Sequence, residues 1–160
     1  MAEKIYLALG ANMGDRWQSL QKTAAALPPA VAVLRASPVF ETPPWGYLDQ
    51  PAFFNQVLEC STDLAPLELL VYLKSLEPHL GRTPTFRNGP RVIDIDILLY
   101  GSQVVDLPEL IIPHPRLAER AFVLVPLAAL VPDLVIPGRA DSVSECLARV
   151  DRAGIKEVYG

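Results

Sequence analysis

The chain has 160 residues, of which 51% are hydrophobic and 20% charged, and its net charge is −4. This size and composition predict a single domain over residues 1–160 and exclude a disordered chain. The acidic balance argues against a nucleic-acid surface, and prolines interrupt the hydrophobic region 121–136, which argues against a membrane span. The N-terminal apolar stretch is too short for a signal peptide, so we expect a cytoplasmic protein.

The first part of the chain alternates strand and helix patterns. Three segments mix β-branched and apolar side chains as strands do: 4–9, 31–40 and 52–62. After the first of them, Asp15 is expected to cap a helix that runs to Leu27. A loop with three prolines, 41–51, separates the other two.

The middle of the chain adds a second helix and the clearest strand. Residues 66–77 predict a helix with an apolar face, which Pro66 begins and Pro78 ends. Residues 92–100 predict the strand. The order strand, helix, strand, strand, helix, strand indicates an α+β, ferredoxin-like βαββαβ core, a mainly antiparallel sheet with two helices packed on one face.

A C-terminal extension follows this core. Its segment 121–135 fits either a strand or a helix, because its hydrophobic residues show no clear period. Residues 141–150 predict a helix capped by Asp141. The two cysteines, Cys60 and Cys146, have no disulfide or zinc spacing, and both are expected in the core.

The strand "VIDIDILLY" carries two carboxylates, Asp94 and Asp96. Side chains alternate along a strand, so both point the same way, with Cβ atoms roughly 6–7 Å apart. If Ile93, Ile95 and Ile97 face the core, both carboxylates lie on the opposite face. Two bare carboxylates about 6 Å apart repel by about 3 kcal/mol at an effective dielectric of about 20, so a cation is expected between them. Oxygen ligands favour Mg²⁺. The alternative is a solvent-facing strand whose polar positions happen to be aspartate, and the spacing alone occurs in several enzyme classes.

Arginine is the only basic residue type between residues 82 and 120. The five are Arg82, Arg87, Arg91, Arg116 and Arg120. Guanidinium groups bind phosphate oxygens in pairs, so a phosphate ligand is one interpretation and a solvated surface is the other. No P-loop and no dinucleotide-binding glycine motif is present. Arg82 and Arg91 are placed to reach a triphosphate held over the aspartates.

The segment "TPPWGYLDQPAFFN" gathers aromatic rings near an amide. Asn55 follows Trp45, Phe53 and Phe54. This combination suits a flat heteroaromatic ligand, because aromatic rings can stack on its faces and the amide can form hydrogen bonds with its edge. Strand alternation places one of the two phenylalanines in the core and leaves the other for a pocket.

Three further side chains have two interpretations each. Lys74 and Glu77 are one helical turn apart, and a surface ion pair is the simpler reading. His114 lies between two prolines that fix its backbone, beside Arg116 and Arg120, so it is either a structural residue or a phosphate contact.

Four motifs together resemble the 6-hydroxymethyl-7,8-dihydropterin pyrophosphokinase family of folate biosynthesis. They are "ALGANMGD", "TPPWGYLDQPAFFN", "GPRVIDIDILLYG" and "IPHPRLAERAFVLVPL", in this order between about residues 4 and 138. The resemblance implies transfer of pyrophosphate from ATP to the hydroxymethyl group of the pterin, with release of AMP. It also implies two Mg²⁺ ions held by Asp94 and Asp96. We expect a monomer that binds these small molecules and neither nucleic acid nor membrane.

The resemblance also assigns the site residues. The implied catalytic residues are Arg82, Arg91, Asp94 and Asp96. The implied ATP contacts are Lys74, Glu77, Arg82, Arg91, Ile97, His114 and Arg120. The implied pterin contacts are Thr42, Pro43, Trp45, Phe53, Asn55 and Phe122.

Three positions depart from the pattern of some members. Asn88 stands where they have tryptophan, Pro115 where they have tyrosine, and Pro84 lies in a slightly shorter loop that could be stiffer. Two rival functions share the aspartates: a two-metal nuclease or phosphohydrolase, and a ligand-binding module without activity. The nuclease or phosphohydrolase predicts a basic groove, whereas this chain is acidic. The ligand-binding module leaves the arginines and the aromatic loop unexplained.

Overall fold

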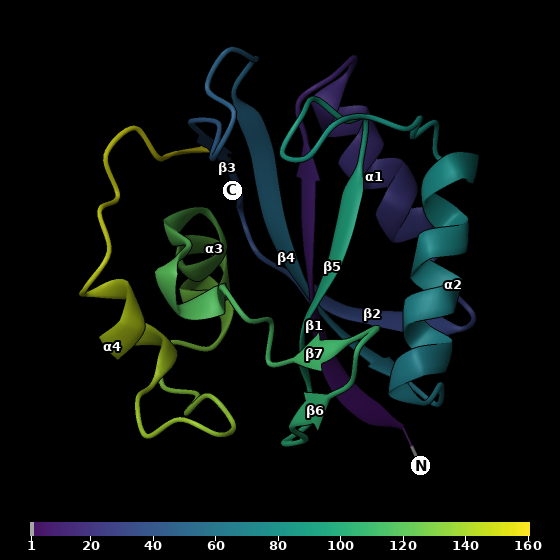
Figure 1. Ribbon diagram of the computed structural model, residues 1–160, viewed down its shortest axis with the longest axis vertical. Helices are drawn as coiled ribbons and strands as arrows, with labels where there is room; N and C mark the ends of the chain where they lie inside the picture. The colour runs from purple at the N-terminus through teal and green to yellow at the C-terminus, as the bar shows by residue number, and fades with distance from the viewer. Residues whose placement is uncertain (1) are drawn as a thin grey trace.

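The computed structural model describes residues 2–160 and places helices on both faces of a large sheet (Figure 1). The strands are β1 Glu3–Ala11, β2 Val31–Ala36, β3 Val39–Thr42, β4 Phe53–Thr62, β5 Asp94–Tyr100, β6 Val105–Asp106, β7 Ile111–Ile112 and β8 Lys156–Tyr159. The helices are α1 Arg16–Ala26, α2 Pro66–His79, α3 Ala121–Leu130 and α4 Val143–Leu147, with a 3₁₀ turn at Leu117–Glu119.

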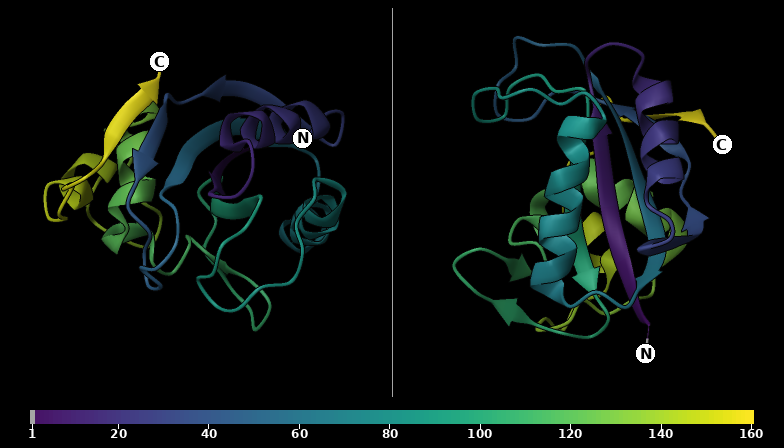
Figure 2. Two further views of the ribbon diagram at one scale, coloured as in Figure 1. Left: turned by 90° about the horizontal axis from the view of Figure 1, so that it is seen from above. Right: turned by 90° about the vertical axis from the view of Figure 1, so that its right-hand side faces the viewer.

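The large sheet is antiparallel throughout. Its order is β5-β1-β4-β3-β8, and β2 also pairs with β4. β6 and β7 form a separate hairpin. The first part reproduces the predicted βαββαβ arrangement, with α1 and α2 on one face, and the C-terminal extension adds α3 and α4 on the other (Figures 1 and 2). The predicted α+β, ferredoxin-like fold is therefore confirmed.

Strand alternation builds a core on each face of the sheet. The side chains directed to α1 and α2 include Ile5, Leu7, Leu9, Ile93, Ile95 and Ile97. Those directed to α3 and α4 include Tyr6, Val57, Leu98 and Leu99. Cys60 belongs to the first core and Cys146 to the second, as predicted, and both thiols are free.

Two apolar segments differ from the simplest reading of the sequence. The predicted strand 31–40 is divided into β2 and β3 at Ser37 and Pro38. Proline has no N–H for the ladder, and Ser37 instead exchanges hydrogen bonds with the backbone of Val57. Most of the segment 121–135, which fitted strand or helix, is helix α3 over Ala121–Leu130. It is apolar on nearly all sides because the sheet and α4 enclose it.

Two predicted helix ends were wrong. α2 continues through Pro78 to His79, and the Leu80 N–H still reaches the Leu76 carbonyl. α4 begins at Val143 and is capped by Ser142, whose Oγ accepts from the backbone N–H of Glu145. The expected cap, Asp141, is instead held by the guanidinium groups of Arg139 and Arg149. Over residues 2–160, no helix combines the length and the apolarity needed to cross a bilayer.

Candidate active site

The two aspartates lie on one face of β5, as predicted. Asp94 pairs with Gly10 of β1 and Asp96 pairs with Ala8, whereas the intervening isoleucine faces the opposite core. The neighbours of both carboxylates are thus the two smallest residue types. Ala8, Gly10, Asp94 and Asp96 all line one cavity, because short side chains on β1 leave open space in front of the carboxylates.

This cavity collects most of the predicted site. Its space free of protein atoms is about 520 Å³, which includes volume that is open to solvent. The predicted site residues in its wall are Thr42, Pro43, Trp45, Phe53, Asn55, Arg91, Asp94, Asp96, Arg120 and Phe122. Phe54 is in the core and Phe53 faces the cavity, so the predicted division of the two phenylalanines is confirmed. We call this space the aromatic cavity.

Asn55 is held in the wall of the aromatic cavity by strand register. It pairs with Gly10 on one side and with Phe40 on the other. Its Nδ2 donates to Thr42 Oγ1 at 2.6 Å. A Cβ at position 10 would lie 3.0 Å from Asn55 Oδ1, so glycine leaves this oxygen room to accept a hydrogen bond from a ligand. The Asn55 amide is therefore buried and oriented, and its Oδ1 remains available to accept a hydrogen bond from a ligand.

A second cavity adjoins the first at Asp96. Its space free of protein atoms is about 600 Å³, part of it open to solvent, and it brings together Lys74, Ile97, His114 and Asp96. Part of its wall comes from residues 108–111, which are the end of the β6–β7 loop and the first residue of β7. Asp96 belongs to the walls of both cavities, so ligands in the two cavities would meet at this carboxylate. We call this space the hairpin cavity.

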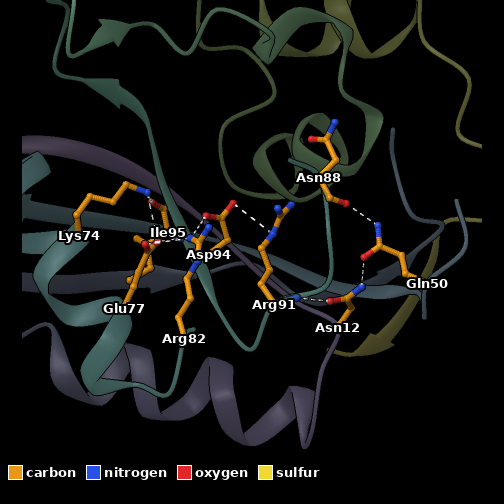
Figure 3. Close-up of polar contacts among 9 residues, drawn as sticks. All are labelled: Asn12, Gln50, Lys74, Glu77, Arg82, Asn88, Arg91, Asp94 and Ile95. Carbon is orange, nitrogen blue, oxygen red and sulfur yellow. Dashed lines mark hydrogen bonds and ion pairs between the residues drawn. The ribbon is translucent and has the colours of Figure 1, made fainter. Parts of the chain in front are cut away.

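Glu77 and Arg82 line neither cavity but lie beside Asp94, toward α2 (Figure 3). The buried carboxylate of Glu77 accepts from the Ile95 backbone N–H at 2.8 Å, from Lys74 Nζ at 3.3 Å and from Arg82 Nη1 at 3.0 Å. Arg82 Nη1 also donates to Asp94 Oδ1 at 2.7 Å. The simple surface pair of Lys74 and Glu77 is thus wrong for Glu77, which joins α2 to β5 and orients Arg82.

The two aspartates differ in their electrostatic surroundings. Burial raises the pKa of Asp94, but the charges of Arg91, Lys74 and Arg82 outweigh it and hold this pKa below its ordinary value. Burial, together with the negative charge of Asp94, raises the pKa of Asp96 to about 7. A cation beside Asp96 would favour its charged form.

The donor set fits Mg²⁺. Within residues 2–160 no three His, Cys, Asp or Glu side chains converge as a metal site. Mg²⁺, however, commonly takes only one or two protein carboxylates and completes its shell with substrate phosphates and water. Asp94 and Asp96 supply two oxygen-bearing groups on one open face, next to cavities large enough for a phosphate ligand.

Basic groups at the site have unused hydrogen-bond donors. Among the described residues, the buried side-chain nitrogens without a hydrogen-bond partner are Nε of Arg120 and Nε of Arg91, the latter lying 3.8 Å from Asp94 Oδ2 as an ion pair. Buried polar groups are nearly always paired, so these two donors indicate a site for an anionic ligand. Burial, together with the nearby charge of Arg120, lowers the pKa of His114 to about 4. Its Nδ1 accepts from the Arg116 N–H, so the neutral ring carries its proton on Nε2.

Asn12 and Gln50 connect the loops around the aromatic cavity and were missed in the sequence (Figure 3). Asn12 Nδ2 donates to Gln50 Oε1 at 2.7 Å, and Asn12 Oδ1 accepts from the Arg91 backbone N–H at 2.9 Å. Gln50 Nε2 donates to the carbonyl of Asn88 at 2.7 Å. Asn88 has a φ of 58°, which asparagine tolerates better than most residues. The only signal for Asn12 and Gln50 was their position inside two of the quoted motifs.

Comparisons with known proteins give one consistent result. Residues 6–132 match the family model described as 7,8-dihydro-6-hydroxymethylpterin-pyrophosphokinase (HPPK). A protein of Methylorubrum extorquens named 2-amino-4-hydroxy-6-hydroxymethyldihydropteridine pyrophosphokinase is 46% identical over 97% of this chain and 98% of its own length. A protein of Pseudomonas aeruginosa with the same name is 42% identical over 100% of this chain and 99% of its own.

The solved structures agree on the fold. A crystal structure of Plasmodium falciparum HPPK-DHPS with pteroate superposes with a TM-score of 0.75 at 16% identity, covering 92% of this chain. The chain spans 42% of the length of that protein. A second structure, of an HPPK-DHPS with substrates, gives a TM-score of 0.73 over 91% of this chain and 45% of that one. From the sequence match over most of its length, this chain belongs to the HPPK family.

Proposed function

We propose that the protein transfers the pyrophosphoryl group of ATP to the hydroxymethyl group of 6-hydroxymethyl-7,8-dihydropterin, a step of folate biosynthesis. The observation that carries the proposal is the meeting of two cavities at Asp96, one lined by aromatic rings and an amide and the other by Lys74 and His114. Family membership and the names of the relatives support it.

The aromatic cavity suits the pterin. Phe53 and Phe122 would stack on the flat ring system, and Trp45 would close the cavity from the loop. Asn55 Oδ1 would accept from the amino or ring N–H groups along the pterin edge, while its own amide stays oriented by Thr42. This arrangement would direct the hydroxymethyl group of the pterin toward the aspartates.

The hairpin cavity suits the nucleotide. Ile97 would contact the base, and Lys74 would lie beside it. The phosphates would extend toward Asp96, where the guanidinium groups of Arg91 and Arg120 each keep an Nε without a hydrogen-bond partner. The neutral ring of His114 would donate its Nε2 proton to a phosphate oxygen. Arg82 would act through Asp94, or reach the phosphates after leaving it.

Asp94 and Asp96 would hold the two Mg²⁺ ions that such a transfer uses. When bound, Mg²⁺ would neutralise charge on the attacking and leaving oxygens. The pterin hydroxyl oxygen would form a bond to the β-phosphorus of ATP, and the bond from that phosphorus to the α,β-bridging oxygen would break. AMP leaves with the bridging oxygen, and the hydroxyl proton passes to solvent. The loops joined by Asn12 and Gln50 would exclude competing water.

Product analysis tests the proposal. The protein is mixed with MgATP and 6-hydroxymethyl-7,8-dihydropterin, and the nucleotides and pterins are separated by chromatography. AMP that forms in equal amount with a pyrophosphorylated pterin is the expected result. ADP or inorganic phosphate with an unchanged pterin would contradict the transfer and favour a phosphohydrolase.

The metal assignment has its own test. Asp96→Asn should lower turnover by about 10²–10³-fold, as removal of one charge-stabilising group commonly does. It should also raise the Mg²⁺ concentration needed for half-maximal activity. Asp106→Asn, at an exposed position on β6, is the matched control and should leave both quantities unchanged. An Asp96→Asn variant with the Mg²⁺ dependence of wild type would contradict the role of Asp96 as a ligand.

A further inference from the structure

The C-terminal segment 150–159, which we call the strap, runs behind the loop that carries Pro43. Its strand β8 lies beside β3 (Figure 2). In this pairing Lys156 lies opposite Glu41. Lys156 Nζ lies 3.4 Å from Glu41 Oε1. Tyr159 stacks on Trp17 of α1, with 4.1 Å between the ring centroids. These contacts fix the strap to β3, the strand that leads directly into the loop of the aromatic cavity.

One glycine of the strap presses its backbone against that loop. Gly154 has a φ of +81°, and a Cβ built on it would lie 2.7 Å from Pro43 Cγ. This is closer than real Cβ contacts, so any other residue at 154 would displace one of the two segments. Pro43 lines the aromatic cavity on one side and, on the other, a space walled by Ala153 and Ile155 of the strap.

A displacement of Pro43 would reach the amide of the aromatic cavity. Pro43 directly follows Thr42, whose Oγ1 accepts the hydrogen bond that orients Asn55. The proline ring fixes its own φ, so the loop cannot absorb a push at this residue by rotating that bond. The strap is held at β8 by pairing and stacking, which limits its own retreat.

We propose that Gly154 is a positioning residue for the pterin: its bare backbone supports Pro43 and thereby sets the wall of the aromatic cavity. The inference rests on the proposed function, because that function assigns this cavity to the pterin. The strap lies beyond residues 6–132, which match the family model, so none of the matched motifs contains this support. The strap lines neither cavity, but it contacts Pro43 in the wall of the aromatic cavity, so its effect is expected on the pterin side.

A matched pair of variants tests the role of Gly154. Gly154→Ala adds a Cβ against Pro43, whereas Gly138→Ala adds one at nearly the same φ, +80°, with Val104 Cγ2 at an ordinary 3.4 Å. Both carry the same left-handed backbone strain, so their difference isolates the contact with Pro43. The KM values for pterin and for MgATP are measured for each variant, and pterin binding is measured by calorimetry with a non-hydrolysable ATP analogue present.

Gly154→Ala should raise the pterin KM and Kd by roughly five- to twentyfold, since small misplacements at a site are costly, and leave the MgATP KM within about twofold. Gly138→Ala should change neither beyond about twofold. Equal pterin constants for the two variants, or a parallel rise in the MgATP KM, would overturn the inference. If Gly154→Ala does not fold, Gly154→Asn and Gly138→Asn decide by the same criteria, because asparagine tolerates this φ.

The wild-type protein is assayed first. A wild type that forms no AMP with pterin and MgATP would refute the proposed function. An active wild type with indistinguishable Gly154 and Gly138 variants would refute only the positioning role of Gly154.

Discussion

Replacing Glu77 by glutamine should destabilise the protein substantially. The Glu77 side chain is 6% exposed, and its two oxygens accept from Arg82, Lys74 and the Ile95 backbone N–H. Glutamine has one acceptor oxygen, so its amide nitrogen must face Arg82 or the pair formed by Lys74 and Ile95. Loss of at least one hydrogen bond to a charged group costs about 1.5–3 kcal/mol. For a domain of this size, the unfolding temperature should fall by roughly 3–12 °C.

Urea unfolding at neutral pH measures the change, with the midpoint compared at an unchanged slope. The matched control is Glu119→Gln, which removes an equally charged group that is 64% exposed and 3.9 Å from Arg116. An exposed pair of this kind contributes at most about 1 kcal/mol. If Glu77→Gln costs no more than Glu119→Gln, the buried carboxylate does not hold α2 to β5.

Two further changes test the second core and the aromatic cavity. Arg35 donates to Glu59 and, despite burial, holds the pKa of the Glu59 carboxyl at about 2, below its ordinary 4.5. This ion pair therefore stabilises the fold fully above about pH 4.5, and its contribution is lost as the pH falls toward 2. Glu59→Gln should therefore flatten the decline of the urea midpoint between pH 5 and 3, and parallel curves for variant and wild type would contradict this. Phe122→Ala should weaken pterin binding in calorimetry more than it lowers kcat, because stacking acts alike on ground and transition states. A lowered kcat with unchanged pterin affinity would contradict the stacking.

Local patterns predicted those features that depend on local geometry. The common face of Asp94 and Asp96 follows from a period of two residues, and the flanking isoleucines identified which face was buried. Asp15 could be predicted as a helix cap because the partner of its side chain, the backbone N–H of Gln18, lies only three residues further along the chain.

Features that depend on distant partners could not be predicted. Glu77 looked like half of a surface pair because its decisive partner, the Ile95 N–H, comes from another element. Asp141 looked like a helix cap because nothing local shows that arginines at 139 and 149 compete for it. The helix α3 has no hydrophobic period to detect, since it is enclosed on most sides. For the strap, no local pattern indicated pairing with β3.

The register of β5 against β1 is what makes a binding site out of a core strand. A slip of one residue would turn Asp94 and Asp96 toward α1 and α2 and would move Ile95 into the aromatic cavity. The burial of Ile93, Ile95 and Ile97 opposes this slip, because each would lose its place in the core. In the observed register the carboxylates lie opposite Ala8 and Gly10, where they have both space and nearby arginines. Hydrophobic burial on one face of the sheet therefore positions the charges on the other.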